Sequence, residues 1–87
     1  MPVIEIYTTR FCPYCVRAKQ LLNKKGAVYT EIPVDANSDK KREMIDRSKR
    51  FTVPQIFIGD YHVGGYDDMV ELDLDDKLDD LLKGGDS

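Results

Sequence analysis

The sequence has few of the features of disulfide-rich, metal-rich or membrane-spanning proteins. Its 87 residues include two cysteines, one histidine and no tryptophan. Two cysteines cannot build the multi-disulfide framework of a small secreted domain. No apolar run approaches the ~18 residues that a membrane-spanning helix needs, and the first residues lack the basic and then apolar pattern of a secretory signal. We therefore expect a cytoplasmic protein.

The length of the chain limits its organisation. Eighty-seven residues suffice for one hydrophobic core but not for two, so we expect a single domain over residues 1–87. The hydrophobic content of 41% and the charged content of 33% are those of an ordinary globular protein. Residues 84–87, Gly-Gly-Asp-Ser, are expected to form a disordered tail.

The net charge of -3 is unevenly distributed along the chain. Residues 1–66 hold 11 Lys or Arg against 7 Asp or Glu, whereas residues 67–87 hold 2 against 9. The acidic residues of the second segment alternate with leucines, which is typical of an amphipathic helix whose acidic side faces solvent. The alternative interpretation is an acidic surface that binds basic partners. The basic residues 40–50 are not interleaved with aromatics, so we expect a solvated helix face and no nucleic-acid contact.

The pattern of apolar residues predicts an α/β fold. Pro13 suits the first turn of a helix and Gly26 its end. The predicted elements are strands at 3–7, 29–34, 54–58 and 61–63, and helices at 13 to about 25, 39–49 and 68 to about 83, the last broken near Asp73. The order β-α-β-α-β-β-α gives a four-stranded mixed sheet with helices on both faces, because a helical crossover joins a parallel pair and a Gly59-Asp60 turn closes a hairpin. This order resembles the thioredoxin fold.

Both cysteines lie in one motif, Cys12-Pro13-Tyr14-Cys15, between the first strand and the first helix. Unpaired N–H groups and the positive end of the helix dipole favour a thiolate at a helix N-terminus, and Arg10 would add positive charge. Cys15 follows on the same face of the first turn, within reach of a mixed disulfide on Cys12. We predict that Cys12 attacks and that Cys15 resolves.

Zinc binding and simple core packing are less favoured roles for the two cysteines. A zinc site needs about four ligands, and His62 is the one further candidate; we assign His62 to strand packing instead. Two unpaired core cysteines would not require Pro13 between them or an arginine in the approach loop. The position between a strand and a helix therefore favours redox chemistry.

Three separated segments resemble dithiol glutaredoxins, closest to the bacterial glutaredoxin 3 type. They are the Cys-Pro-Tyr-Cys motif at 12–15, Thr-Val-Pro at 52–54 and Gly-Gly-Tyr-Asp-Asp at 64–68. Together they extend the resemblance over essentially the whole chain. The resemblance implies a glutathione-dependent thiol–disulfide oxidoreductase that reduces protein–glutathione mixed disulfides and protein disulfides.

The resemblance also implies a binding site for glutathione, the co-substrate. The Val53–Pro54 bond would be cis, and the backbone of Val53 would pair with the cysteine of glutathione. The start of the last helix would bind the γ-glutamyl group. Asp67 would be the best partner for the ammonium of that group. The full set is Arg10, Tyr14, Thr52, Val53, Pro54, Gly65, Tyr66, Asp67 and Asp68. The implied partners are glutathionylated or disulfide-containing proteins, with ribonucleotide reductase as one candidate. We expect a monomer without metal or membrane contact.

The sequence departs from the family pattern at two positions. Thr9 stands where many members carry a lysine that meets the glycine carboxylate of glutathione, and neighbouring Arg10 is the candidate substitute. Tyr66 stands where a smaller residue is common.

Three alternatives stay open. Two concern the function: a thiol donor reduced by a flavoprotein, and an iron–sulfur carrier. The third concerns residues 64–68, which could be a simple helix start with Asp68 and Glu71 as its capping pair.

Overall fold

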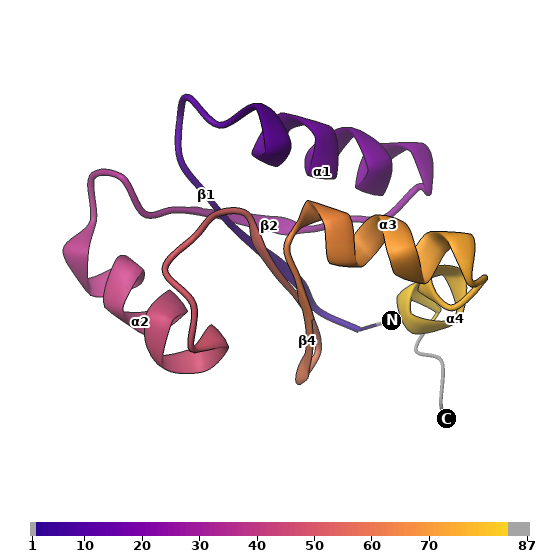
Figure 1. The fold of residues 1–87 in the computed structure, drawn as a ribbon. Coiled ribbons are helices and arrows are strands. Elements are labelled where there is room, and N and C mark those ends of the chain that lie inside the picture. The colour runs from indigo at the N-terminus through magenta and orange to yellow at the C-terminus, as the bar shows by residue number, and fades with distance from the viewer. Residues whose placement is uncertain (1, 84–87) are drawn as a thin grey trace.

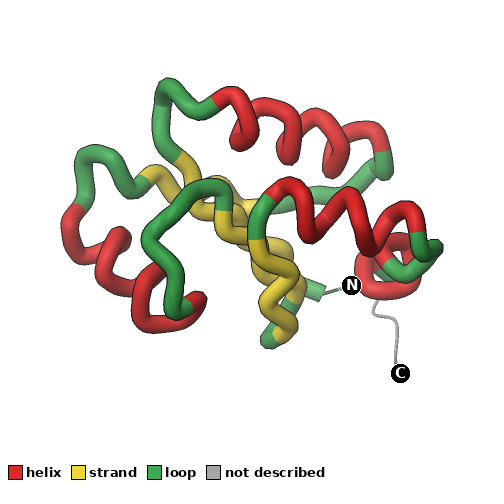
Figure 2. Tube along the Cα trace, in the orientation of Figure 1, coloured by secondary structure: helices red, strands yellow, loops and turns green. Residues whose placement is uncertain are grey.

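The computed structural model describes residues 2–83, and the predicted tail lies outside the described residues. Figures 1 and 2 show the strands at the centre of the protein and the helices around them. In chain order the elements are β1 (Ile4–Thr8), α1 (Pro13–Lys24), β2 (Thr30–Pro33), α2 (Ser38–Ser48), β3 (Gln55–Ile58), β4 (Tyr61–Gly64), α3 (Tyr66–Leu74) and α4 (Leu78–Leu82).

The strands form one mixed sheet in the order β2-β1-β3-β4. β1 pairs in parallel with β2 and antiparallel with β3, and β3 pairs antiparallel with β4. α1 and α3 cover one face of the sheet and α2 covers the other (Figure 1). The predicted four-stranded sheet with helices on both faces is confirmed.

The core has two parts because β1 is covered on both faces. Side chains alternate along a strand, so Ile4 and Ile6 face one layer of helices while Tyr7 faces the other. The cluster under α1, α3 and α4 contains Ile4, Ile6, Ala18, Leu22, Ile56, Ile58, Val63, Met69, Leu78 and Leu82. The cluster under α2 contains Tyr7, Val34, Met44 and Phe57. Burial on both faces explains the nearly continuous apolar run in β1.

The ends of α1 follow the predicted signals. Cys12 is the N-cap, with extended backbone angles, and Pro13 is the first helical residue. Gly26 follows the C-cap with a φ of 72°, in the left-handed region that glycine adopts at little cost. The helix therefore starts directly at the cysteine motif.

The end of the chain is helical with a break, as predicted, but the bounds of its helices differ from the prediction. The helix begins at Tyr66, two residues before the predicted start, and a turn with Asp76 at a φ of 60° divides it into α3 and α4. Leu74 is 79% exposed, whereas Leu78 is buried. The turn changes the direction of the chain, so leucines on its two sides do not share one face. Lys25 pairs across this turn with Asp73 at 2.6 Å and Asp79 at 3.1 Å.

Within residues 2–83, no helix has both the length and the apolar character needed to cross a membrane.

Candidate functional site

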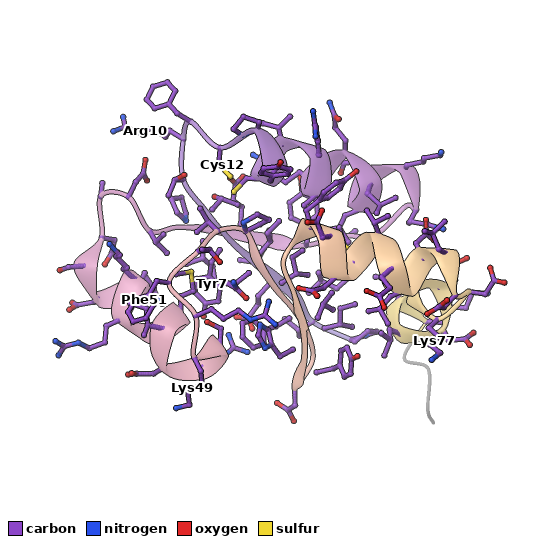
Figure 3. All side chains as sticks on the ribbon, viewed as in Figure 1. Tyr7, Arg10, Cys12, Lys49, Phe51 and Lys77 are labelled. Carbon is purple, nitrogen blue, oxygen red and sulfur yellow. The ribbon has the colours of Figure 1, made fainter. Side chains whose placement is uncertain are left out.

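Cys12 lies where the chain passes from β1 to α1, at one end of the sheet (Figure 3). The backbone N–H of Cys15 donates to Cys12 Sγ at 3.1 Å, and the Sγ of Cys12 lies 3.7 Å from the carbonyl oxygen of Val53. The sulfur is partly exposed, so a substrate can reach it. A backbone donor and the positive end of the helix dipole suit a sulfur that carries or develops negative charge.

Cys15 has the opposite environment, because it points into the protein and is 1% exposed. Burial, and then the hydrogen bond to Cys12, raise the pKa of the Cys15 thiol to about 12, so it stays protonated at neutral pH. The negative charge of Cys12 also contributes to the raised pKa of Cys15. Both contributions from Cys12 would disappear once its sulfur is held in a mixed disulfide.

A cleft of about 250 Å³ lies beside Cys12, between the loop before β3 and the start of α3. The Val53–Pro54 peptide bond in its wall is cis, as the resemblance implied. The cleft brings together all of the predicted binding residues except Arg10, namely Tyr14, Thr52, Val53, Pro54, Gly65, Tyr66, Asp67 and Asp68.

The two aspartates at the rim of the cleft differ in their contacts. Asp68 Oδ2 accepts hydrogen bonds from the Gly65 N–H at 2.9 Å and from Arg50 Nη1 at 2.9 Å. The Gly65 N–H first, and then the Arg50 guanidinium, lower the pKa of the Asp68 carboxyl. Asp67 is exposed and forms no salt bridge with any residue of the described chain. Asp67 is therefore free to bind a ligand cation, while Asp68 holds the start of α3.

The alternative in which Asp68 and Glu71 form the capping pair of the last helix is wrong. Gly65 is the N-cap of α3, and Asp68 reaches back to the Gly65 N–H from the third helical position. Gly64 has a φ of 108°, and a Cβ there would collide with the Asp68 carboxylate. The close approach of Gly64 to Asp68 explains why a glycine precedes this cap.

Tyr66 forms part of the cleft wall together with Tyr14. Their ring centroids are 6.3 Å apart with an angle of 36° between the planes. The guanidinium of Arg17 lies 5.5 Å from the centroid of the Tyr14 ring. The phenol of Tyr66 therefore extends an aromatic wall that a smaller residue would not provide.

Arg10 is not at the cleft. Its backbone N–H and its Nε both donate to Asp35 Oδ2, at 3.1 and 3.0 Å, and its side chain is 75% exposed. These hydrogen bonds, the backbone one first, lower the pKa of the Asp35 carboxyl. Asp35 thus holds the guanidinium away from the cysteine motif (Figure 3).

Sequence reasoning missed a second cleft, of about 630 Å³, on the other side of Val53. Its wall includes Thr9, Phe51 and Val53, and Lys41 provides a cation there. Lys41 is one of several basic residues in α2, and nothing in the sequence distinguishes it from its neighbours. Val53 borders both clefts, so a ligand paired with its backbone can extend in two directions.

No group of three or more potential metal-binding side chains occurs within residues 2–83. His62, the one further zinc ligand considered from the sequence, instead places its Nε2 2.7 Å from Gln55 Oε1.

An apolar cleft of about 360 Å³ lies near the far end of α1, around Gly26, Ala27 and Val28. Neither cysteine lines this cleft.

A family model, sequence relatives and solved structures all relate the chain to the same family. The family model described as glutaredoxin matches residues 4–63. The chain is 55% identical over 83 residues to glutaredoxin 3 of Escherichia coli (strain K12), covering 95% of this chain and 100% of that protein. The solution structure of a glutaredoxin from Brucella melitensis is 53% identical, with a TM-score of 0.84, covering 95% of this chain and 90% of that one. The crystal structure of a buckwheat glutaredoxin–glutathione complex is 32% identical, with a TM-score of 0.87 and coverage of 95% and 78%.

Proposed function

The chain belongs to the glutaredoxin family of oxidoreductases, and we propose that it reduces protein–glutathione mixed disulfides and protein disulfides with electrons from glutathione. One observation carries the proposal: the partly exposed sulfur of Cys12 lies 3.7 Å from the Val53 carbonyl, at a cleft lined by an aromatic wall and a helix start. We further propose that the protein works as a single-domain monomer in the cytoplasm, where glutathione is the abundant thiol.

Two reactions follow from this arrangement. With a glutathionylated protein, the Cys12 thiolate attacks the glutathione sulfur and the protein leaves as a thiolate. A second glutathione thiolate then attacks the disulfide on Cys12, and oxidised glutathione leaves. With a protein disulfide, Cys12 forms a mixed disulfide with one protein sulfur. Cys15 then attacks Cys12, and the protein leaves as a dithiol, while two glutathiones reduce the bond between Cys12 and Cys15.

The position proposed for glutathione uses both clefts beside Val53. Its cysteine pairs with the Val53 backbone in a strand-like manner, which points its sulfur toward Cys12. The γ-glutamyl carboxylate meets N–H groups at the first turn of α3, which have no partner within the helix, and its ammonium meets Asp67. The glycine carboxylate extends toward Lys41 in the second cleft. Lys41 thereby takes the place of the lysine that Thr9 replaces.

The contact with the ammonium gives a direct prediction. Asp67→Asn should raise the KM for a glutathionylated peptide about five- to tenfold with little change in kcat, because a charge-assisted hydrogen bond is lost at an exposed site. The matched control is Asp80→Asn, which removes an exposed carboxylate from α4, away from the cleft. Equal KM values for the two variants would contradict the proposed role of Asp67.

The source of electrons is tested with two coupled assays. One supplies glutathione with glutathione reductase, and the other supplies a flavoprotein thioredoxin reductase without glutathione. We expect turnover of a glutathionylated peptide in the first assay alone. Turnover supported only by the flavoprotein would favour a thioredoxin-like donor and overturn the proposal.

A further inference from the structure

The side chain of Gln55 joins the loop that carries Val53 to the edge strand β4. Gln55 is the first residue of β3 and is fully buried. Its Nε2 donates to the carbonyl oxygen of Thr52 at 3.1 Å and to the hydroxyl oxygen of Thr52 at 3.2 Å. Its Oε1 lies 2.7 Å from His62 Nε2. All three contacts therefore belong to one buried amide.

The chemistry of these groups fixes the direction of each hydrogen bond. The Thr52 carbonyl can only accept, so the amide nitrogen of Gln55 must face it and Oε1 must face His62. Oε1 can only accept as well, so His62 must donate from Nε2. Reversing the amide would place two acceptors against each other at Thr52. The Thr52 carbonyl thus fixes which way the Gln55 amide is turned, and His62 supplies the donor that Gln55 Oε1 needs in that orientation.

The ring of His62 is itself held in place. It stacks on Phe57 with ring centroids 4.7 Å apart and 20° between the planes. The guanidinium of Arg47 lies 4.0 Å from the centroid of the same Phe57 ring. The imidazole is therefore oriented by packing before it donates to Gln55, and Gln55 in turn holds Thr52.

Thr52 has few further constraints. Among the described residues, neither Thr52 nor Val53 forms a backbone–backbone hydrogen bond. Val53 is the next residue along the chain, and its carbonyl oxygen lies 3.7 Å from Cys12 Sγ. The hydrogen bonds from Gln55 are thus the main polar restraint on the backbone next to Val53.

We propose that Gln55 and His62 are positioning residues for the reaction, because they fix Thr52 and through it the backbone of Val53 against which the glutathionyl group binds. This inference rests on the proposed function. Neither side chain touches the reacting sulfurs. Their effect should therefore be on substrate binding at Val53, with the chemistry at Cys12 left largely unchanged.

The test compares His62→Phe with His62→Gln. Phenylalanine keeps a flat ring to stack on Phe57 and lacks the donor, whereas glutamine offers an N–H at a similar reach. We expect His62→Phe to raise the KM for a glutathionylated peptide about fivefold, with kcat within about twofold of the wild-type value, because one buried acceptor loses its partner. The ¹⁵N order parameter of the Val53 amide should fall in the same variant. His62→Gln should restore both quantities most of the way.

Tyr7→Phe is the control for loss of a hydrogen bond on this face of the sheet. The Tyr7 hydroxyl donates to Glu43 at 2.5 Å and accepts from Arg47 at 2.9 Å, and neither hydrogen bond involves Thr52, Gln55 or His62. We expect Tyr7→Phe to leave KM and the Val53 order parameter unchanged. The positioning role is overturned if His62→Phe behaves like the wild type, or if Tyr7→Phe changes both readouts equally. Failure of the proposed function looks different: the wild type would not turn over the glutathionylated peptide, while the order parameters would still test the positioning role.

Discussion

Cys12→Ser should abolish both activities, with the rates of deglutathionylation and of protein-disulfide reduction falling on the order of 10³-fold or more. A serine hydroxyl is not ionised at neutral pH and cannot form a disulfide, so neither reaction has a first step. The measurement is the rate with a glutathionylated peptide and with a protein disulfide, in the glutathione-coupled assay.

The control for this prediction is the fold of the variant. Cys12 is a partly exposed N-cap, and serine is also a good N-cap, so the melting temperature should change little. A folded Cys12→Ser variant that keeps a substantial part of either activity would contradict the assignment of Cys12 as the attacking residue.

Cys15→Ser should separate the two activities. We expect protein-disulfide reduction to fall on the order of 10²-fold or more, because a resolving thiol one helical turn away has a very high effective concentration that a free thiol cannot match. Deglutathionylation should stay within about threefold of the wild-type rate, because glutathione itself resolves that intermediate. Both rates are measured as for Cys12→Ser.

Cys15 is buried, so the substitution requires a second variant as a control. Cys15→Ala avoids placing a hydroxyl in the core, and it should show the same separation of activities. If both variants lost all deglutathionylation while remaining folded, the role given to Cys15 would be wrong.

The sequence predicted the elements around the cysteine motif well, because their signals are local. A continuous apolar run marks β1, and Pro13 and Gly26 mark the ends of α1. At the end of the chain the sequence predicted a broken helix but not its bounds, since alternating leucines and aspartates are compatible with a helix on either side of the break. The turn at Asp76 and the ion pairs from Lys25 depend on tertiary contacts that no local pattern reveals.

The parts of the site that the sequence did not predict depend on contacts between distant residues. Arg10 is adjacent to the motif in sequence, yet Asp35, 25 residues away, binds its guanidinium. The contact between Gln55 and His62 joins β3 to β4, whose pairing is irregular between Ile56 and Phe57. The residues around the main cleft, by contrast, were all contained in three short motifs, and the fold brings those motifs together beside Cys12.

The structure also explains why two identical side chains can have different roles. Cys12 has a backbone donor and access to solvent, while burial keeps the pKa of Cys15 at about 12. These environments support the proposed roles, in which Cys12 meets the substrate and Cys15 stays protonated until Cys12 has reacted.

The most direct test of this mechanism is a solution structure of the Cys15→Ser variant after reaction with oxidised glutathione. We predict one glutathionyl group on Cys12, with its cysteine paired to the backbone of Val53 and its γ-glutamyl group against Asp67. Absence of an adduct, or an adduct whose tripeptide makes no contact with Val53 and Asp67, would contradict the mechanism.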